Sequence, residues 1–297
     1  MHVALWGTRG SLGSPGAETA RYGGNTSCVE VRGPNGTALV LDAGTGIRRL
    51  GAALPRSLRR VDVLLTHLHM DHIQGLGFFA PLYNSEIEVH IWGPASTTLH
   101  LRNRLMRYLS PPLFPVRLRE LPCQLVLHEV PCGDFDIGEF HISALLIGHP
   151  GPTVGYRIAT LQATLAYMPD HEPALGVRQF PLSREWTSGY AVAADVDLLI
   201  HDAQYSSQEY PSHIGWGHSS LPQALAFAAL ADVKQFVPFH HDPAHTDEDL
   251  DRLIAEATAA VRPVFTVTPG TEGAIFDLGV AEKATHASTA PVRRSLS

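Results

Sequence analysis

Four side chains that commonly bind metal ions stand within one six-residue segment of this 297-residue chain. They are His67, His69, Asp71 and His72, and they follow directly on the mainly apolar run 61–66. Two positions apart in an extended chain, His67 and His69 point the same way and can bind one ion. Where the chain then turns into a helix, Asp71 and His72 can face a second ion about 3.5–4 Å away. The spacing predicts a two-metal site, with a simple cluster of histidines in a turn as the alternative.

The segments that must position these residues alternate between strand and helix patterns. Short apolar runs bounded by Gly and Asp predict strands, and apolar residues one helical turn apart predict helices. The ranges expected to be strands are 2–7, 27–32, 38–42, 61–66, 86–92, 124–130, 139–147, 153–160, 163–168, 198–200, 235–239, 264–267 and 274–278. The ranges expected to be helices are 73–83, 97–109, 184–194, 219–231 and 246–260. Because no long linker divides them, we expect one α/β domain of two helix-covered sheets over residues 1–280, followed by a loose polar tail at 281–297.

The composition suits a globular protein and argues against long nucleic acid as a partner. Hydrophobic residues make up 44% and charged residues 17% of the chain, so a large core is expected. The 22 Lys and Arg against 29 Asp and Glu give a net charge of -7. Proteins that bind nucleic acid by its phosphates usually carry a basic face. Arg102, Arg104 and Arg107 lie in one predicted helix and could bind a phosphate group. The favoured interpretation is that they only form the solvent-exposed face of that helix.

The cysteines and the N-terminal residues bear on where the protein works. Cys28, Cys123 and Cys132 give neither a disulfide framework nor a Cys-x-x-Cys zinc site. Free thiols in a reducing cytosol are the favoured interpretation, with a Cys123–Cys132 bridge as the alternative. The first residues lack a basic start followed by an apolar run, and no apolar stretch approaches the ~20 residues of a membrane span. These features predict a cytoplasmic protein that does not enter a membrane.

The segment His67-x-His69-x-Asp71-His72 resembles the signature of the metallo-β-lactamase superfamily. The resemblance implies a four-layer αββα sandwich with a dinuclear metal site at one edge. Its nitrogen and oxygen ligands suit two divalent ions, with zinc favoured and Mn²⁺ or Fe as alternatives.

Three further residues extend this resemblance in the expected order along the chain. His149, Asp170 and His240 each follow a predicted strand, where a rigid scaffold can present a ligand. The ligands that the resemblance implies are His67, His69 and His149 for the first ion, Asp71, His72 and His240 for the second, and Asp170 for both. His241 is the alternative to His240 as a ligand, and otherwise a residue that supports the site.

Another histidine indicates a branch of the superfamily. His218 lies in the run 215–220, which resembles a motif of the phosphodiesterase and ribonuclease Z-like branch. The resemblance implies that His218 protonates the leaving oxygen of a phosphate ester and that Asp71 orients it. Histidine suits this task because its pKa lies near neutrality. A turn in which His218 only packs is the alternative. Asp42, in a Gly-rich segment that also resembles this branch, is expected to support the metal-binding histidines.

Together these features predict a dinuclear metal-dependent hydrolase. The favoured activity is that of a phosphodiesterase, in which a metal-bridged hydroxide attacks a small phosphodiester or cyclic phosphate. The resemblance is greatest to class II-like cyclic nucleotide phosphodiesterases. The alternatives are a ribonuclease Z-type nuclease, a hydrolase of carboxylic esters, lactones, thioesters or β-lactams, and a non-catalytic protein that keeps the fold. A small-molecule phosphodiester is the expected partner, nucleic acid is less favoured, and a homodimer is compatible with the sequence.

Overall fold

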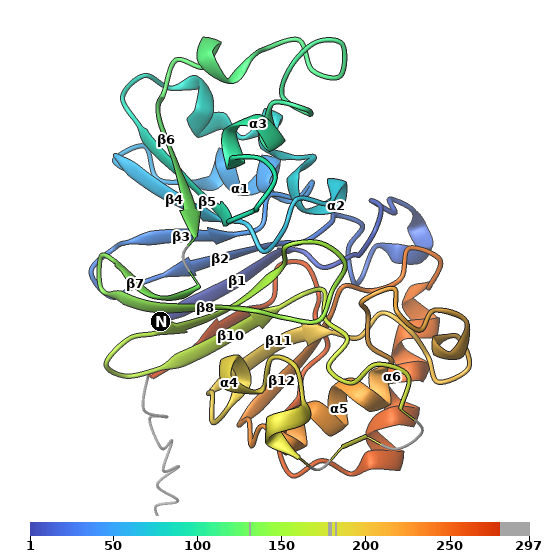
Figure 1. Ribbon diagram of the computed structural model, residues 1–297. Coiled ribbons are helices and arrows are strands. Elements are labelled where there is room, and N and C mark those ends of the chain that lie inside the picture. Colours follow the sequence, from blue (N-terminus) through green and yellow to red (C-terminus); the bar gives the residue numbers. More distant parts are fainter. Residues whose placement is uncertain (131, 178–179, 182, 280–297) are drawn as a thin grey trace, which may run out of the picture.

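Two seven-stranded sheets form the centre of the molecule (Figure 1). The computed structural model describes residues 1–130, 132–177, 180–181 and 183–279, so the tail expected at 281–297 lies outside the described residues. The strand order of the first sheet is β14 (Ile275–Asp277), β1 (His2–Gly7), β2 (Cys28–Arg32), β3 (Ala38–Leu41), β4 (Arg60–Leu64), β5 (Glu88–Pro94) and β6 (Gln124–Val130). The order of the second is β13 (Thr266–Val267), β12 (Gln235–Phe239), β11 (Leu198–Asp202), β10 (Thr164–Met168), β9 (Val154–Ala159), β8 (Phe140–Leu146) and β7 (Gly133–Ile137).

Each sheet is part antiparallel and part parallel. In the first sheet, the pairs from β14 to β3 are antiparallel and those from β3 to β6 are parallel. In the second, the pairs from β7 to β10 are antiparallel and those from β10 to β13 are parallel. Parallel neighbours end at the same edge of a sheet, which is where open α/β sheets present their ligand-binding loops. The predicted metal ligands follow strands at this edge.

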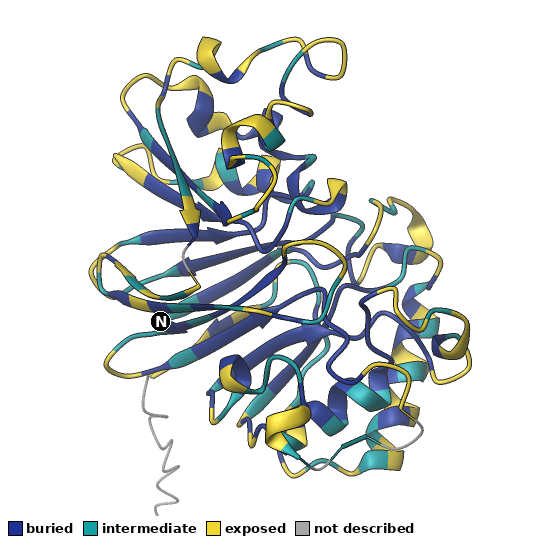
Figure 2. Cartoon of the chain, in the orientation of Figure 1, coloured by how far each residue is buried: buried dark blue, intermediate teal, exposed yellow. Residues whose placement is uncertain are grey.

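Helices complete the four layers. The helices against the first sheet are α1 (Ile47–Ala53), α2 (Met70–Ile73) and α3 (Leu101–Leu105), and those against the second are α4 (Tyr190–Ala193), α5 (Leu221–Leu230) and α6 (Asp247–Val261). One buried apolar cluster fills the space between the sheets, and one lies under each helical layer. Figure 2 shows the buried residues running along the strands. The αββα sandwich expected from the sequence is confirmed.

The two long helices were predicted because their ends carry capping residues. Thr246 begins α6, and its hydroxyl accepts a hydrogen bond from the backbone N–H of Asp249. Ser220 caps α5 in the same way through the N–H of Gln223. The predicted range 219–231 begins at Ser219, one residue before this cap. Ser219 instead donates its hydroxyl to the carbonyl oxygen of His171, close to the functional site.

The three other predicted helices are shorter than expected. The range 73–83 contains only the end of α2 and two 3-10 turns, at Leu76–Phe78 and Ala80–Tyr83. Pro81 in that range cannot donate a helical hydrogen bond. In 184–194, a 3-10 turn and α4 are separated by Gly189, which has a left-handed φ of 71°. In 97–109 the helix is only α3. Tertiary contacts end these helices, and a sequence pattern does not contain those contacts.

Other sequence predictions concern cysteines and membranes. Cys28, Cys123 and Cys132 are all free, so the alternative Cys123–Cys132 bridge does not form. Within the described ranges, no helix is both long enough and apolar enough to cross a bilayer.

A matched pair of leucines tests the assignment of the core between the sheets. Leu165, in β10, is fully buried, whereas Leu161, in the turn before it, is fully exposed. Leu165→Ala should lower the free energy of unfolding by about 2–5 kcal/mol, because it leaves a cavity between the sheets. Leu161→Ala should change it by less than about 0.5 kcal/mol. Urea denaturation measures both, and equal losses would contradict this packing.

Candidate metal centre

The loops at the carboxyl edge of the sheets bring together all seven residues predicted to be metal ligands. They form two groups, within each of which one nitrogen or oxygen atom per residue lies within 4.8 Å of the others. The first group is His67, His69, His149 and Asp170, and the second is Asp71, His72, Asp170 and His240. Asp170 belongs to both groups, as a carboxylate shared between two ions would.

Asp170 directs one carboxylate oxygen toward each group. Its Oδ2 lies 3.6 Å from Nε2 of His67 and 3.6 Å from Nε2 of His149. Its Oδ1 lies 2.9 Å from Nε2 of His72 and 3.2 Å from Nε2 of His240. Because Asp170 follows β10 in the second sheet, its side chain reaches ligands from both sheets. This geometry suits a bridging carboxylate.

The turn between β4 and α2 sets the directions of four ligands. The rings of His67 and His69 pack edge to face, with their centroids 4.4 Å apart. His69 is in extended backbone immediately before α2, which begins at Met70. The change from extended to helical backbone turns Asp71 and His72 toward the second group. The sequence predicted this change of direction correctly, although α2 itself is only one turn long.

Asp42 is a buried carboxylate that holds one ligand ring in place. It follows β3 with a left-handed φ of 59°, which non-glycine residues adopt rarely. Its oxygens accept hydrogen bonds from Nδ1 of His72 at 2.8 Å, the backbone N–H of Thr66 at 2.7 Å and the hydroxyl of Tyr167 at 3.0 Å. When His72 donates through Nδ1, its Nε2 is left free to bind a metal. Asp42 therefore lies where the sequence placed a supporting residue.

Two more ligand histidines are oriented through their other ring nitrogen. Nδ1 of His149 lies 2.9 Å from the carbonyl oxygen of Gly217, and Nδ1 of His240 lies 2.9 Å from Oε1 of Gln204. Both acceptors favour the tautomer with a free Nε2. A Cβ atom at Gly217 would lie 2.3 Å from Nδ1 of His149, and one at Gly10 would lie 2.3 Å from Nδ1 of His240. The close approach of these loops therefore requires glycine.

The donor atoms fit a pair of divalent cations. Asp71 and Asp170 are buried, and among the described residues neither forms an ion pair with a lysine or arginine. Nε2 of His67 is also buried, and it has no hydrogen-bond partner among the described residues. Burial holds the pKa of His67 well below its ordinary value and lowers the pKa of His149 to about 4. At His67 and His149, neutral imidazoles beside buried carboxylates are donors that divalent transition metals prefer. Burial alone would lower the pKa of His72, but the carboxylates of Asp170 and Asp71 outweigh it and raise that pKa, so a metal bound at His72 would displace its proton.

His218 lies beside these ligands, in the loop between β11 and α5. Its ring stacks on that of His240 with the centroids 5.0 Å apart. Its Nδ1 lies 2.6 Å from Oδ2 of Asp202. Burial alone would lower the pKa of His218, but the charge and hydrogen bond of Asp202 outweigh it and raise that pKa to about 9. The prediction that Asp71 orients His218 is wrong, because Asp202 is the carboxylate at Nδ1 of His218. Asp71 Oδ2 instead lies 3.1 Å from Nε2 of His240 and accepts a hydrogen bond from the N–H of Ser11.

Asp202 and Gln204 are functional residues whose roles the sequence did not reveal. Asp202 holds His218 and also accepts a hydrogen bond from the backbone N–H of Ser219 at 2.9 Å. Gln204 holds His240. Both residues lie at or just beyond the end of β11, a fully buried strand. The same signal that identified the ligands, polar residues at the end of an apolar strand, could have found them.

The rings of His240 and His241 point in different directions, and of the two only His240 belongs to a ligand group. His241 directs Nε2 at the carbonyl oxygen of Gly270, 2.8 Å away, and packs edge to face against Tyr22. Burial lowers the pKa of His241 to about 3. The left-handed φ of 59° at His240 sends that ring toward the metal ligands and its neighbour away from them.

Metal content distinguishes these two histidines in solution. His240→Ala should lower the bound metal from about two ions per chain to about one, because the second group loses a ligand. His241→Ala should keep about two ions, since its ring contacts Tyr22 and the carbonyl oxygen of Gly270 and belongs to neither ligand group. Plasma mass spectrometry on purified protein measures both, with thermal unfolding to confirm that each variant is folded. Loss of metal in His241→Ala alone would reverse the assignment.

Sequence comparison with known proteins agrees with the resemblance to the metallo-β-lactamase superfamily. The family described as the beta-lactamase superfamily domain matches residues 37–241. Ribonuclease Z from Anoxybacillus flavithermus is 25% identical over 245 residues, which cover 68% of this chain and 75% of the relative. Ribonuclease BN from Erwinia tasmaniensis is 24% identical over 301 residues, covering 87% of this chain and 95% of the relative.

Solved structures share the fold at low sequence identity. The metallo-beta-lactamase fold protein YhfI from Bacillus subtilis has a TM-score of 0.67 and 20% identity, covering 93% of this chain and 98% of its own. A diphosphatase from the PhnP family has a TM-score of 0.66 and 17% identity, covering 94% and 98%. Yeast PDE1 has a TM-score of 0.65 and 14% identity, covering 94% and 99%. The family match over residues 37–241 shows that the chain belongs to the metallo-β-lactamase superfamily.

Proposed function

We propose that this protein hydrolyses a small phosphodiester or cyclic phosphate at the candidate metal centre. The observation that carries the proposal is the pair of His218 and Asp202, which adds a proton donor to the ligand groups. Hydrolysis of a carboxylic ester or β-lactam needs the metals but not such a donor at this position. Ribonuclease Z, a relative by sequence, and the diphosphatase from the PhnP family, a structural neighbour, are named for reactions at phosphorus.

The ligand residues and His218 have separate tasks in this reaction. The seven ligand residues would hold two divalent ions, with zinc favoured, and these ions would supply positive charge for the phosphate oxygens and a more acidic water for attack at phosphorus. Asp202 keeps His218 protonated near neutral pH, since it raises the pKa of His218 to about 9. The protonated ring can then give its Nε2 proton to the departing oxygen, while Asp202 holds the ring still.

The charge of the surrounding loops favours a small substrate. The segments that carry the site are 8–16, 42–46, 65–79, 147–153, 169–177, 202–220 and 240–246, and their only lysine or arginine is Arg9. Arg9 is fully buried and donates to the carbonyl oxygens of Gly23, Asp242 and His245. Within these seven segments of the described chain, no exposed cation is available to the successive phosphates of a nucleic acid.

A nuclease of the ribonuclease Z type is the second candidate, and one observation favours it. Arg102, Arg117 and Arg119 line a cavity of about 210 Å³ beside α3, apart from the loops that carry the ligands. Arg104 is not part of this group, because its guanidinium donates to the carbonyl oxygen of Pro94. Three arginines around one cavity could contact the phosphates of an RNA whose cleaved bond lies at the metals.

Removing His218 tests the proposed reaction. His218→Ala should lower kcat for a cyclic nucleotide by about 10²–10⁴-fold, because the departing sugar oxygen loses its proton donor. It should lower kcat for bis-p-nitrophenyl phosphate much less, because p-nitrophenolate leaves without a proton. Metal content measured on the same sample should stay at about two ions per chain. Asp202→Asn should lower kcat by about 10-fold or more while His218 is still present. Unchanged turnover of the cyclic nucleotide in His218→Ala would contradict the role of His218, and turnover of carboxylic esters alone would favour the other hydrolase class.

The nuclease candidate makes a separate prediction. If RNA binds the arginine cavity, Arg102→Ala with Arg117→Ala should weaken cleavage of a precursor tRNA about tenfold or more and reduce its dependence on salt. Turnover of bis-p-nitrophenyl phosphate should not change, because both residues lie outside the ligand loops. Under the favoured function, the wild-type protein leaves the precursor tRNA intact and turns over only the small diester.

A further inference from the structure

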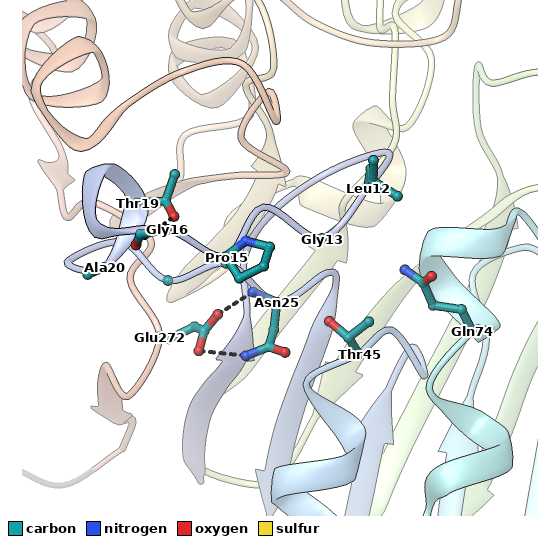
Figure 3. Close-up of a pocket in the computed structure, with 12 residues that line it drawn as sticks. Leu12, Gly13, Pro15, Gly16, Thr19, Ala20, Asn25, Thr45, Gln74 and Glu272 are labelled. Atoms are coloured by element: carbon teal, nitrogen blue, oxygen red, sulfur yellow. Dashed lines mark hydrogen bonds between the residues drawn. The ribbon is translucent and has the colours of Figure 1, made fainter.

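A cavity of about 290 Å³ lies against one of the metal ligands. The ligand His149 lines it, together with its neighbours Gly148 and Pro150. The rest of its lining comes from the segment after Asp170 and from the loop before His218, and consists of Glu172, Leu175, Gly215 and Gly217. A larger cavity, of about 560 Å³ and lined mainly by residues 12–25, contains none of the seven ligands (Figure 3). Of the two, the smaller cavity is therefore the one that a substrate bound at the ligands can reach.

The lining of the smaller cavity is mostly backbone and apolar side chains. It includes three glycines, a proline and Leu175, and the described residues that line it include no lysine or arginine. The carboxylate of Glu172 already accepts hydrogen bonds from the hydroxyl of Tyr210 at 2.6 Å and from the backbone N–H of Gly217 at 3.0 Å. A second anionic group would therefore find no cation here, and it would lie close to a carboxylate.

Apolar side chains are exposed at the rim of the same cavity. Leu175 is 66% exposed, and Trp216, which follows Gly215, is 59% exposed. A Cβ atom at Gly215 would lie 3.9 Å from Cδ1 of Leu175. A Cβ atom at Gly176 would lie 3.4 Å from Cγ2 of Ile214, so the two segments meet. Exposed apolar side chains gathered beside a ligand site are typical of a binding surface, because a ligand that covers them removes apolar area from water.

We infer that this cavity binds an uncharged apolar ester group of the substrate, carried on the same phosphate that meets the metal ligands. The inference rests on the proposed function and adds the chemical class of one of the two ester groups. The phosphate would lie at His149 and the other ligands, and the apolar group would cover Leu175 and the glycines of 215–217. A charged or strongly hydrated group at this position would leave the apolar rim in water and gain little from the cavity.

Phosphonates of equal charge isolate the apolar contact. We expect hexylphosphonate or phenylphosphonate to bind the metal-loaded protein with a Kd about tenfold or more below that of methylphosphonate. The physical reason is that each methylene that leaves water strengthens binding about fourfold. Isothermal titration calorimetry measures the three Kd values, and the tighter of the two larger probes shows whether the preferred group is alkyl or aryl.

Two variants make the smaller cavity polar, and two controls leave it as it is. Leu175→Ser replaces the exposed apolar side chain, and Gly215→Asn adds an amide at a left-handed φ of 85°, which asparagine tolerates. Each should bring the ratio of the Kd values toward one. Leu161→Ser, in the exposed turn before β10, should keep the wild-type ratio. Gly13→Leu, which fills the larger cavity of Figure 3, should keep it as well.

The outcomes separate this inference from the function on which it rests. If the same sample hydrolyses neither bis-p-nitrophenyl phosphate nor a cyclic nucleotide, the proposed function fails and the inference fails with it. If it hydrolyses either one but neither larger phosphonate binds more tightly than methylphosphonate, the proposed function stands and the inference is overturned. The inference is also overturned if folded Leu175→Ser and Gly215→Asn both keep the wild-type ratio, or if Gly13→Leu alone removes it. Thermal unfolding and metal content of each variant show that a change in the ratio is not a loss of structure.

Discussion

The buried carboxylate of Asp170, shared between two groups of histidines, is the interaction on which the rest of the site depends. A buried carboxylate costs several kcal/mol unless positive charge compensates it. No lysine or arginine pairs with Asp170 among the described residues. Ligands come to it from the first sheet, through His67 and His72, and from the second, through His240. Bound cations would therefore hold the two sheets together at this edge as well as support chemistry.

A surrounding set of polar residues fixes the donor atoms that face Asp170. Asp42 holds His72, Gln204 holds His240, and Asp202 holds His218, each through Nδ1. These three residues come at or soon after the ends of β3 and β11, so the parallel parts of both sheets supply the support as well as the ligands. Rigid strand ends suit this purpose because a ligand ring must keep one tautomer and one orientation.

The sequence predicted the metal ligands of this arrangement, but it did not predict the partner of His218 or the short helices. The ligands were predictable because four of them lie within the six residues from His67 to His72. Asp170 and His240 were predictable because they come at or just beyond the ends of apolar strands. The partner of His218 was not predictable, since the pair joins residues 16 apart through a loop whose path depends on the fold. Short helices such as α4 were misjudged because tertiary contacts, not helical periodicity, set their ends. The fold class followed from the resemblance and from the alternation of strands and helices.

An anomalous difference map from crystals of the metal-loaded protein tests the central claim most directly. Data collected at the absorption edge of the bound metal place each ion without reference to activity. Two peaks about 3.5–4 Å apart, one on either side of the Asp170 carboxylate, are the result expected for a dinuclear centre. A single peak bound by one group of ligands, or peaks elsewhere in the molecule, would contradict it.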